Sequence, residues 1–364
     1  MEGLLSGVRA ITWQMPVMWL IGGILIYLAI RRDMEPTLLL PMGFGAILVN
    51  LPISSATPVL ETLFNAGIAN ELFPLLLFIG IGAMIDFGPL LSNPRLLLFG
   101  AAAQFGIFFT LIIASLCGFD LRDAGAIAII GAADGPTSIL VANVFGSKYL
   151  GAITVAAYSY MALVPIVQPP CIRLITTKKE RMIRMEYDPQ NVSKTTRILF
   201  PIIVTAIAGV AAPQSAVLVG FLMFGNLLRE CGVLDNLSDA AQNILAKLIT
   251  LVLGLTVAAR MQAAEFLTVE TLMILGLGLI AFVFDTFGGV FFAKVLNLFL
   301  KKKVNPMIGA AGISAFPMAS RVVHKMGLKE DRQNFLLMHA AGANVAGQIA
   351  SVIAGGMILS LIAH

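Results

Sequence analysis

Long apolar runs, separated by small groups of charged residues or by Pro and Gly, make up most of this chain. A helix needs about 20 consecutive apolar residues to cross the hydrocarbon core of a bilayer, and most of these runs approach or exceed that length. They lie at residues 13–30, 36–52, 73–91, 96–117 and 149–169, and again at about 197–212, 214–228, 242–259, 268–300 and 333–361. The pattern predicts an all-α polytopic membrane protein.

Two further apolar segments, at about residues 125–145 and 305–321, are interrupted near their middle. Each contains a Gly and a Pro five residues apart, namely Gly131 and Pro136 in the first and Gly312 and Pro317 in the second. Pro removes a helical hydrogen bond, and backbone freed at membrane depth must be buried in protein or line a cavity. We therefore expect two re-entrant or broken-helix hairpins, with two ordinary kinked helices as the alternative. Paired interruptions of this kind indicate the binding site of a transporter.

The two series of segments follow the same order, which predicts an internal duplication. Several residues recur at a near-constant separation: Pro36, Gly43 and Phe44 as Pro213, Gly220 and Phe221, and Gly131, Pro136, Gly146 and Lys148 as Gly312, Pro317, Gly327 and Lys329. We expect residues 1–170 to form the first repeat, residues 171–196 a basic cytoplasmic linker, and residues 197–364 the second repeat. Each repeat would hold about five spanning helices and one hairpin.

The distribution of Lys and Arg predicts the orientation of the chain. If each hairpin enters and leaves on one side, and the N-terminus lies outside, then the 171–197 segment and residues 301–303 face the cytoplasm. The few basic residues left for the outer side are Arg9, Arg122, Lys148, Arg260 and, at the margin, Lys247. This asymmetry agrees with the excess of Lys and Arg in cytoplasmic loops. The same arrangement makes the two repeats inverted relative to each other.

Composition supports a membrane protein and excludes other classes. Hydrophobic residues make up 58% of the chain and charged residues 12%, with a mean hydropathy of +0.92, whereas soluble domains carry roughly 25% charged residues. The lipid bilayer is thus the expected surrounding. Nucleic acid is not an expected partner, because the basic residues lie between apolar runs and no nucleic-acid-binding module is visible. The three cysteines show no metal-binding spacing.

Asp134 is the principal candidate for ion chemistry, because it stands in the first interruption, in the sequence GAADGPTS. An ionised carboxylate at membrane depth costs about 2.5–3.5 kcal/mol on insertion scales and needs a partner or a function. Together with freed carbonyl groups it could bind Na⁺ or H⁺, which would compete for the same oxygens. Alternatively, Asp134 caps the second half-helix through the backbone N–H groups of Thr137 and Ser138. Both roles can hold at once.

The second hairpin carries three polar candidates. Asn305 could cap its first half-helix, with Pro306 at the first helical position. Ser314 could offer a hydroxyl group at the interruption. Arg321 could hold a carboxylate through two hydrogen bonds, or it could extend toward the cytoplasmic interface.

The final segment carries a polar stripe, because Asn344, Gln348 and Ser351 are spaced to share one face of a helix. Opposite Asp134, these neutral oxygens would complete a Na⁺ site. The alternative is a set of hydrogen bonds that join neighbouring helices.

Three further residues could take part in ion movement. Tyr158 and Tyr160 could place a hydroxyl group in the ion path, or they could be interfacial tyrosines. Asp285 is a second acid within an apolar segment.

These motifs together resemble a known family. The sequence GAADGPTSIL at residues 131–140, the hairpin with Asn305, Gly309, Ser314 and Arg321, and the sequence GANVAG at 342–347 are similar to the β subunit of the biotin-dependent, sodium-pumping decarboxylases. That group acts on oxaloacetate, glutaconyl-CoA or methylmalonyl-CoA, and the resemblance covers essentially the whole chain.

The resemblance implies roles for individual residues. Asp134 would be the central carboxylate for Na⁺ and the proton, and Asn344 and Ser351 would be further Na⁺ ligands. Residues Asn305, Gly309, Ser314 and Arg321 match the functional hairpin, at which Na⁺ and carboxybiotin are bound. Tyr160, or its neighbour Tyr158, matches the tyrosine of the proton path.

The resemblance also implies partners. Carboxybiotin carried by another subunit would be decarboxylated with uptake of an external proton, and Na⁺ would be exported. The expected partners are a carboxyltransferase subunit, a biotin carrier protein and a small membrane-anchoring subunit, in the inner cell membrane of a prokaryote, with oligomers also conceivable. This chain has no biotin-attachment sequence. The alternative is a stand-alone Na⁺/H⁺ antiporter or Na⁺-coupled anion symporter with inverted repeats.

Overall fold

The computed structural model describes residues 10–32, 35–52, 56–186, 192–211 and 213–362. Within these ranges the chain is helical and has no strand, which confirms the all-α prediction. Arg9, near the N-terminus, and part of the predicted linker, residues 187–191, lie outside the described residues.

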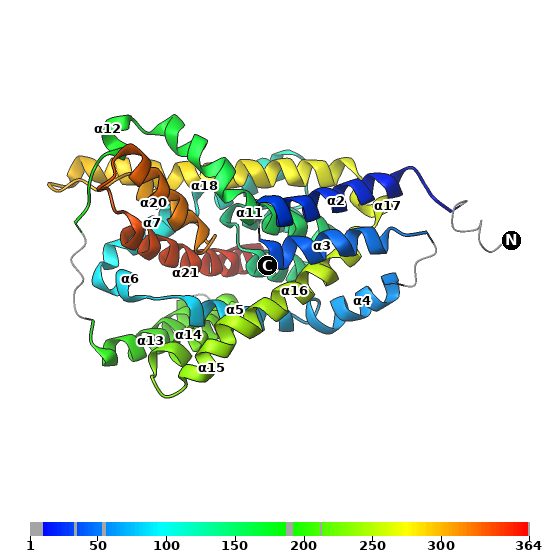
Figure 1. The fold of residues 1–364 in the computed structure, drawn as a ribbon, viewed down its shortest axis with the longest axis horizontal. Helices are drawn as coiled ribbons and strands as arrows, with labels where there is room; N and C mark the ends of the chain where they lie inside the picture. The colour runs from blue at the N-terminus through cyan, green and yellow to red at the C-terminus, as the bar shows by residue number, and fades with distance from the viewer. Residues whose placement is uncertain (1–9, 33–34, 53–55, 187–191, 212, 363–364) are drawn as a thin grey trace.

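The helices before the linker include both parts of the first interrupted segment (Figure 1). They are α2 (Gln14–Arg32), α3 (Pro36–Val49), α4 (Ala56–Gly67), α5 (Leu72–Met84), α6 (Gly88–Ser92), α7 (Leu97–Ala102), α8 (Phe105–Leu116), α9 (Leu121–Ala128), α10 (Gly135–Val144) and α11 (Leu150–Ile175). The sequence pattern did not predict α4.

The later helices include both parts of the second interrupted segment. They are α12 (Lys178–Arg181), α13 (Lys194–Ala211), α14 (Ala216–Glu230), α15 (Asp235–Ala240), α16 (Ala246–Val257), α17 (Ala263–Phe266), α18 (Val269–Phe299), α19 (Met307–Ala310), α20 (Met318–Glu330) and α21 (Leu337–Ile362).

The number of candidate spans is smaller than the predicted ten. Among the described residues, five helices are long and apolar enough to cross a membrane, or up to seven if each of two bent helix pairs forms one span. Two predicted spans fold as the short helices α3 and α14, of 14 and 15 residues. At 1.5 Å per residue they measure about 21 and 22 Å, less than the hydrocarbon thickness of about 30 Å. The chain is a multi-span membrane protein, and the inverted repeat stays a prediction.

Helices from the two predicted repeats pack directly against each other. At the contact of α5 with α14, a Cβ atom on Gly82 would overlap the Leu222 carbonyl group, and one on Gly225 would overlap the Ile79 carbonyl group. Small residues permit such close helix approach in membranes, where packing and hydrogen bonds replace the hydrophobic effect between helices. The two predicted repeats therefore share one core.

A pair of glycines at a second close contact gives a test of this packing. A Cβ atom on Gly289 of α18 would overlap the carbonyl oxygen of Gly309 in α19, whereas one on Gly276 of the same helix would meet no atom within 4 Å. We expect Gly289→Ala to lower the free energy of unfolding by about 1–3 kcal/mol through overpacking. Gly276→Ala should leave it unchanged or raise it by up to about 1 kcal/mol through helix propensity. Thermal unfolding in detergent measures both, and equal melting temperatures would contradict this packing.

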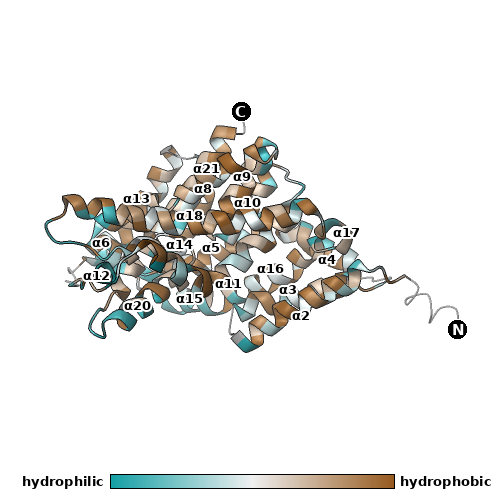
Figure 2. Cartoon of the chain, turned by 90° about the horizontal axis from the view of Figure 1, so that it is seen from above, coloured by the Kyte–Doolittle hydropathy of each residue, from teal (hydrophilic) through white to brown (hydrophobic). Residues whose placement is uncertain are grey.

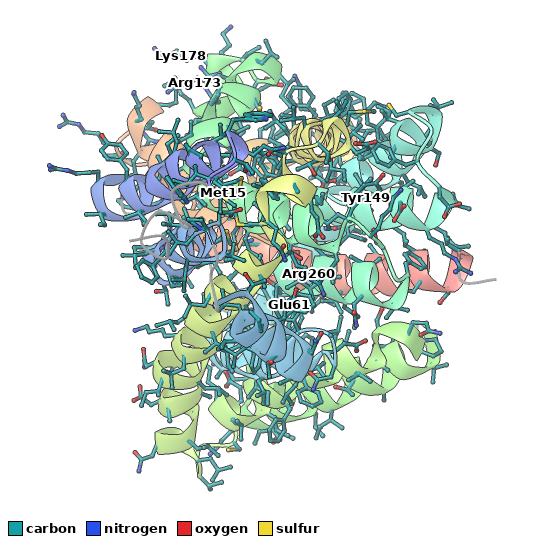
Figure 3. The ribbon with its side chains drawn as sticks, turned by 90° about the vertical axis from the view of Figure 1, so that its right-hand side faces the viewer. Met15, Glu61, Tyr149, Arg173, Lys178 and Arg260 are labelled. Atoms are coloured by element: carbon teal, nitrogen blue, oxygen red, sulfur yellow. The ribbon has the colours of Figure 1, made fainter. Side chains whose placement is uncertain are left out.

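Polar and basic segments gather at the two ends of the helical body. Helix α12 lies beside the end of α18 and near α20 at one end (Figure 1), and hydrophilic residues are prominent around α12 and α17 (Figure 2). Lys148 and Arg260, both predicted to face outside, line one pocket at the opposite end. Figure 3 looks onto that end, with Arg260 and Tyr149 labelled. The predicted orientation assigns these two ends to opposite sides of the membrane, and it stays a prediction.

Candidate functional site

The first interruption places a carboxylate at the start of a half-helix. Helix α9 tightens into a 3₁₀ turn (Ile129–Ala132), and Ala133 then adopts a left-handed conformation with φ 52°. Asp134 follows as the N-cap of α10, and its Oδ1 accepts a hydrogen bond from the Thr137 backbone N–H at 3.2 Å. The predicted cap is therefore confirmed at Thr137. The Ser138 backbone N–H instead donates to the Asp134 carbonyl oxygen.

The other carboxylate oxygen of Asp134 is surrounded by hydroxyl and amide groups. Oδ2 accepts from the Thr137 hydroxyl at 2.7 Å, from the Ser351 hydroxyl at 2.7 Å and from the Gln348 amide at 3.4 Å. Asp134 is only 3% exposed, and Thr137 and Ser351 are fully buried. The structure thus brings two members of the polar stripe on α21 to the acid.

The second interruption lies against the first. After α19 the chain leaves the helix, and the Ser314 backbone N–H donates to the Ala132 carbonyl oxygen at 3.0 Å. The Ser314 hydroxyl donates to the Gly347 carbonyl oxygen at 3.1 Å, and the Asn344 amide donates to the Ile313 carbonyl oxygen at 2.6 Å. Helix α21 therefore anchors the second interruption at the place where the two interruptions meet. Asn344 Oδ1 is buried and accepts no hydrogen bond within the described residues.

A cavity of about 250 Å³ opens beside these groups. Residues from both interruptions line it with parts of α3, α5, α11, α16 and α21, and its polar lining includes Asp134, Ser314, Gln348, Tyr158, Glu35, Thr37, Gln242, Lys247 and Thr250. The cavity gives the buried carboxylate a route toward the protein surface, lined by hydroxyl, amide and charged groups.

The two candidate tyrosines point to different places. The Tyr158 ring packs against Gly135, where a Cβ atom would overlap it, and its buried hydroxyl group has no partner within the described residues. Tyr160 instead donates a hydrogen bond to the Leu275 carbonyl oxygen of α18. The structure therefore places Tyr158 at the cavity, whereas the side chain of Tyr160 is directed toward α18.

The remaining residues of the second hairpin lie away from Asp134. The Asn305 side chain accepts from the Met307 backbone N–H at 3.1 Å, as a cap does, and donates to the Arg181 and Ile183 carbonyl oxygens at 2.9 Å each. Asn305 thereby ties the hairpin to the linker. Gly309 packs backbone to backbone against Gly289.

Arg321 is exposed on α20 and makes no ion pair within the part of the chain that the structure describes. The hairpin also runs past its predicted end at residue 321, because α20 continues to Glu330. This helix is amphipathic: Val322, Val323 and Met326 are buried, while Lys325 and Lys329 are exposed. The hydropathy of the segment therefore underestimated its helical length.

Asp285, the second acid, has a structural partner. Its Oδ1 accepts from the Ile107 backbone N–H at 3.2 Å, at the start of α8. The turn between α7 and α8 interrupts an apolar segment, so the first N–H groups of α8 need an acceptor. Its Oδ2 lies beside Gly131, where a Cβ atom would come within 2.7 Å. Asp285 thus packs against the hairpin that carries Asp134.

The oxygen groups around Asp134 suit a small hard cation. One carboxylate, two hydroxyl groups and side-chain amides are oxygen donors of the kind that such ions prefer. Among the described residues no three His, Cys, Asp or Glu residues form a cluster that could hold a metal ion, as a transition-metal site would require. The polar stripe on α21 predicted Gln348 at this site, and the hydrogen bond of the Thr137 backbone N–H was expected from the cap. The contact of the Thr137 hydroxyl group with Oδ2 was not predicted.

Comparisons with known proteins all indicate similarity to one group, the β subunits of decarboxylases. The profile of the family described as "Na+-transporting oxaloacetate decarboxylase beta subunit" matches residues 14–362. The chain is 48% identical to the methylmalonyl-CoA decarboxylase subunit beta of Veillonella parvula, covering 99% of this chain and 96% of that protein. It is 48% identical to the glutaconyl-CoA decarboxylase subunit beta of Acidaminococcus fermentans, covering 98% and 96%. It is 42% identical to the probable oxaloacetate decarboxylase beta chain of Vibrio cholerae, covering the full length of both.

Proposed function

Since this chain belongs to the family of β subunits of Na⁺-transporting decarboxylases, we propose that Asp134 is the carboxylate through which it couples decarboxylation to Na⁺ export. The chain is a membrane subunit that takes part in decarboxylation and Na⁺ transport within a multi-subunit complex. Its reaction is the decarboxylation of carboxybiotin: the bond between the ureido nitrogen and the carboxyl carbon breaks, CO₂ leaves, and the nitrogen takes up a proton.

One observation carries this proposal. A buried carboxylate lies where two interrupted segments meet, joined by the Ser314 N–H and the Ala132 carbonyl oxygen, and a cavity leads to it. A hydroxyl group has two acceptor lone pairs besides its hydrogen. When Na⁺ replaces the proton, the Ser351 and Thr137 hydroxyl groups can turn their hydrogens away and offer oxygen to the cation.

The energy must come from the partners. Export of one Na⁺ against about 150 mV costs about 3.5 kcal/mol before any concentration term, and this chain has no group that could supply it. A carboxyltransferase subunit would load biotin on a carrier protein, and a small membrane-anchoring subunit would hold the complex at the inner membrane of a prokaryote. Arg321 is exposed on the predicted cytoplasmic side, where it can attract the anionic carboxybiotin.

Competition between Na⁺ and the proton tests this function. Because both bind the Asp134 oxygens, the Na⁺ concentration for half-maximal decarboxylation should rise as the pH falls, by about tenfold per pH unit once the protonated form dominates. The measurement is release of CO₂ by the purified complex in detergent, with choline chloride keeping the ionic strength constant. A half-saturating Na⁺ concentration that stays constant across the pH range would contradict the shared site.

A further inference from the structure

A long apolar groove runs along α18 on the side away from Asp134. It encloses about 960 Å³ between α18 and the pair α7 and α8, near the upper end of the range for ligand pockets, about 300–1,000 Å³. Its walls are mainly apolar and include the six phenylalanines Phe105, Phe108, Phe284, Phe287, Phe291 and Phe292. Such a surface suits hydrocarbon chains.

One end of this groove is basic. A second cavity of about 510 Å³ shares Phe291, Lys294 and Val295 with the first, so the two adjoin along α18. Three lysines line the second cavity, namely Lys179 from α12, Lys294 from α18 and Lys303 from the segment that follows α18. The groove is therefore apolar along most of its length and cationic at one end.

The charge at this end does not cancel. Lys294 pairs with Glu180 at 3.1 Å. Partial burial acts to raise the pKa of Glu180, but the Thr177 backbone N–H and Lys294 outweigh it and hold that pKa below the usual value. Glu180 is thus ionised at neutral pH and neutralises one ammonium group. Lys179 and Lys303 are exposed and leave two positive charges.

The length of α18 would bring the basic end to the depth of the lipid headgroups. Helix α18 has 31 residues and spans about 46 Å, which matches a whole bilayer with its headgroup regions, about 40–45 Å. Lys294 is near the end that is predicted to be cytoplasmic. Phe291 and Leu298 beside it are 67% and 80% exposed, so the groove borders the surrounding lipid.

We propose that this groove is a binding site for an anionic phospholipid, with the phosphate group at Lys179, Lys294 and Lys303 and the acyl chains along the phenylalanines of α8 and α18. Basic pockets between membrane helices on the cytoplasmic side recognise such headgroups. A partner helix or a second copy of the chain would satisfy the apolar walls, but it would also have to place acidic side chains beside Lys179 and Lys303. An amphiphile with one anionic end would fit both the apolar walls and the basic end of the groove.

The test compares phosphatidylglycerol with phosphatidylcholine of the same acyl chains, added to the purified full-length chain in detergent. Native mass spectrometry should show retained phosphatidylglycerol, bound roughly 25-fold more tightly than phosphatidylcholine, from about fivefold for each of the two excess lysines. The double variant Lys179→Gln/Lys303→Gln should lose this preference. The matched variant Lys325→Gln/Lys329→Gln, with two exposed lysines on α20, should keep it.

A second readout locates the acyl chains. Phosphatidylglycerol with brominated chains should quench the fluorescence of a Phe287→Trp variant more strongly than brominated phosphatidylcholine at the same concentration. Equal affinity for the two lipids, an unchanged preference in the Lys179/Lys303 variant, or a second copy of the chain in place of lipid would overturn the proposal. Stabilisation by inorganic phosphate alone would do so as well, because it would show a site for the free anion.

Discussion

Asp134→Asn is expected to abolish Na⁺-dependent decarboxylation while leaving the fold intact. Asn is as good an N-cap as Asp, so α10 should still begin at Gly135, and the Ser351 and Thr137 hydroxyl groups can donate to the amide oxygen. The variant loses the negative charge that a cation needs. Removing one member of a buried, hydrogen-bonded charge pair costs about 2–5 kcal/mol, which is a roughly 30- to 5,000-fold loss of Na⁺ affinity.

The measurement is the rate of decarboxylation as a function of Na⁺ concentration, with thermal unfolding as the check on folding. Asp123→Asn is the matched control, because Asp123 lies on α9 of the same hairpin and accepts a hydrogen bond from Ser147 at 2.5 Å, away from the cavity. We expect the control to retain its Na⁺ dependence. An Asp134→Asn complex that decarboxylates normally and still responds to Na⁺ would remove the proposed coupling.

The main features of this site were visible in the sequence because membrane burial restricts the options of the backbone. An apolar segment interrupted by Gly and Pro must satisfy its freed groups within the protein. That argument predicted the interruption before Asp134 and the one around Ser314, and both are present. The spacing of Gln348 and Ser351 likewise placed both side chains on one face of α21, and both reach Asp134.

The orientation of each helix about its own axis could not be predicted from the sequence. Successive residues of a helix point about 100° apart, since a turn takes 3.6 residues, so Tyr158 and Tyr160 diverge by about 200° and only one can face the cavity. The choice depends on how α11 packs, and that packing directs Tyr160 toward α18. The position of Arg321 could not be predicted for the same reason. An irregular segment precedes α20, so the sequence does not show which side of that helix faces the site. Contact between Asn305 and the linker depends on residues far away in the chain.

Asn344→Ala should weaken Na⁺ binding, because Asn344 holds the backbone of the second interruption in place. The Asn344 amide holds the Ile313 carbonyl oxygen at 2.6 Å, beside Ser314, and losing a partner of a buried polar group costs about 1–3 kcal/mol. The half-saturating Na⁺ concentration should therefore rise roughly 5- to 150-fold.

Asn226→Ala separates this effect from a loss of stability. Asn226 is also a buried Asn that donates to a backbone carbonyl oxygen, that of Ile85 at 3.0 Å, and its Oδ1 likewise accepts no hydrogen bond within the described residues. It joins α14 to the end of α5 and does not line the cavity with Asp134. Both variants should melt at lower temperature, but only Asn344→Ala should require more Na⁺. If the two variants shift the Na⁺ requirement equally, Asn344 stabilises the helices without shaping the ion site.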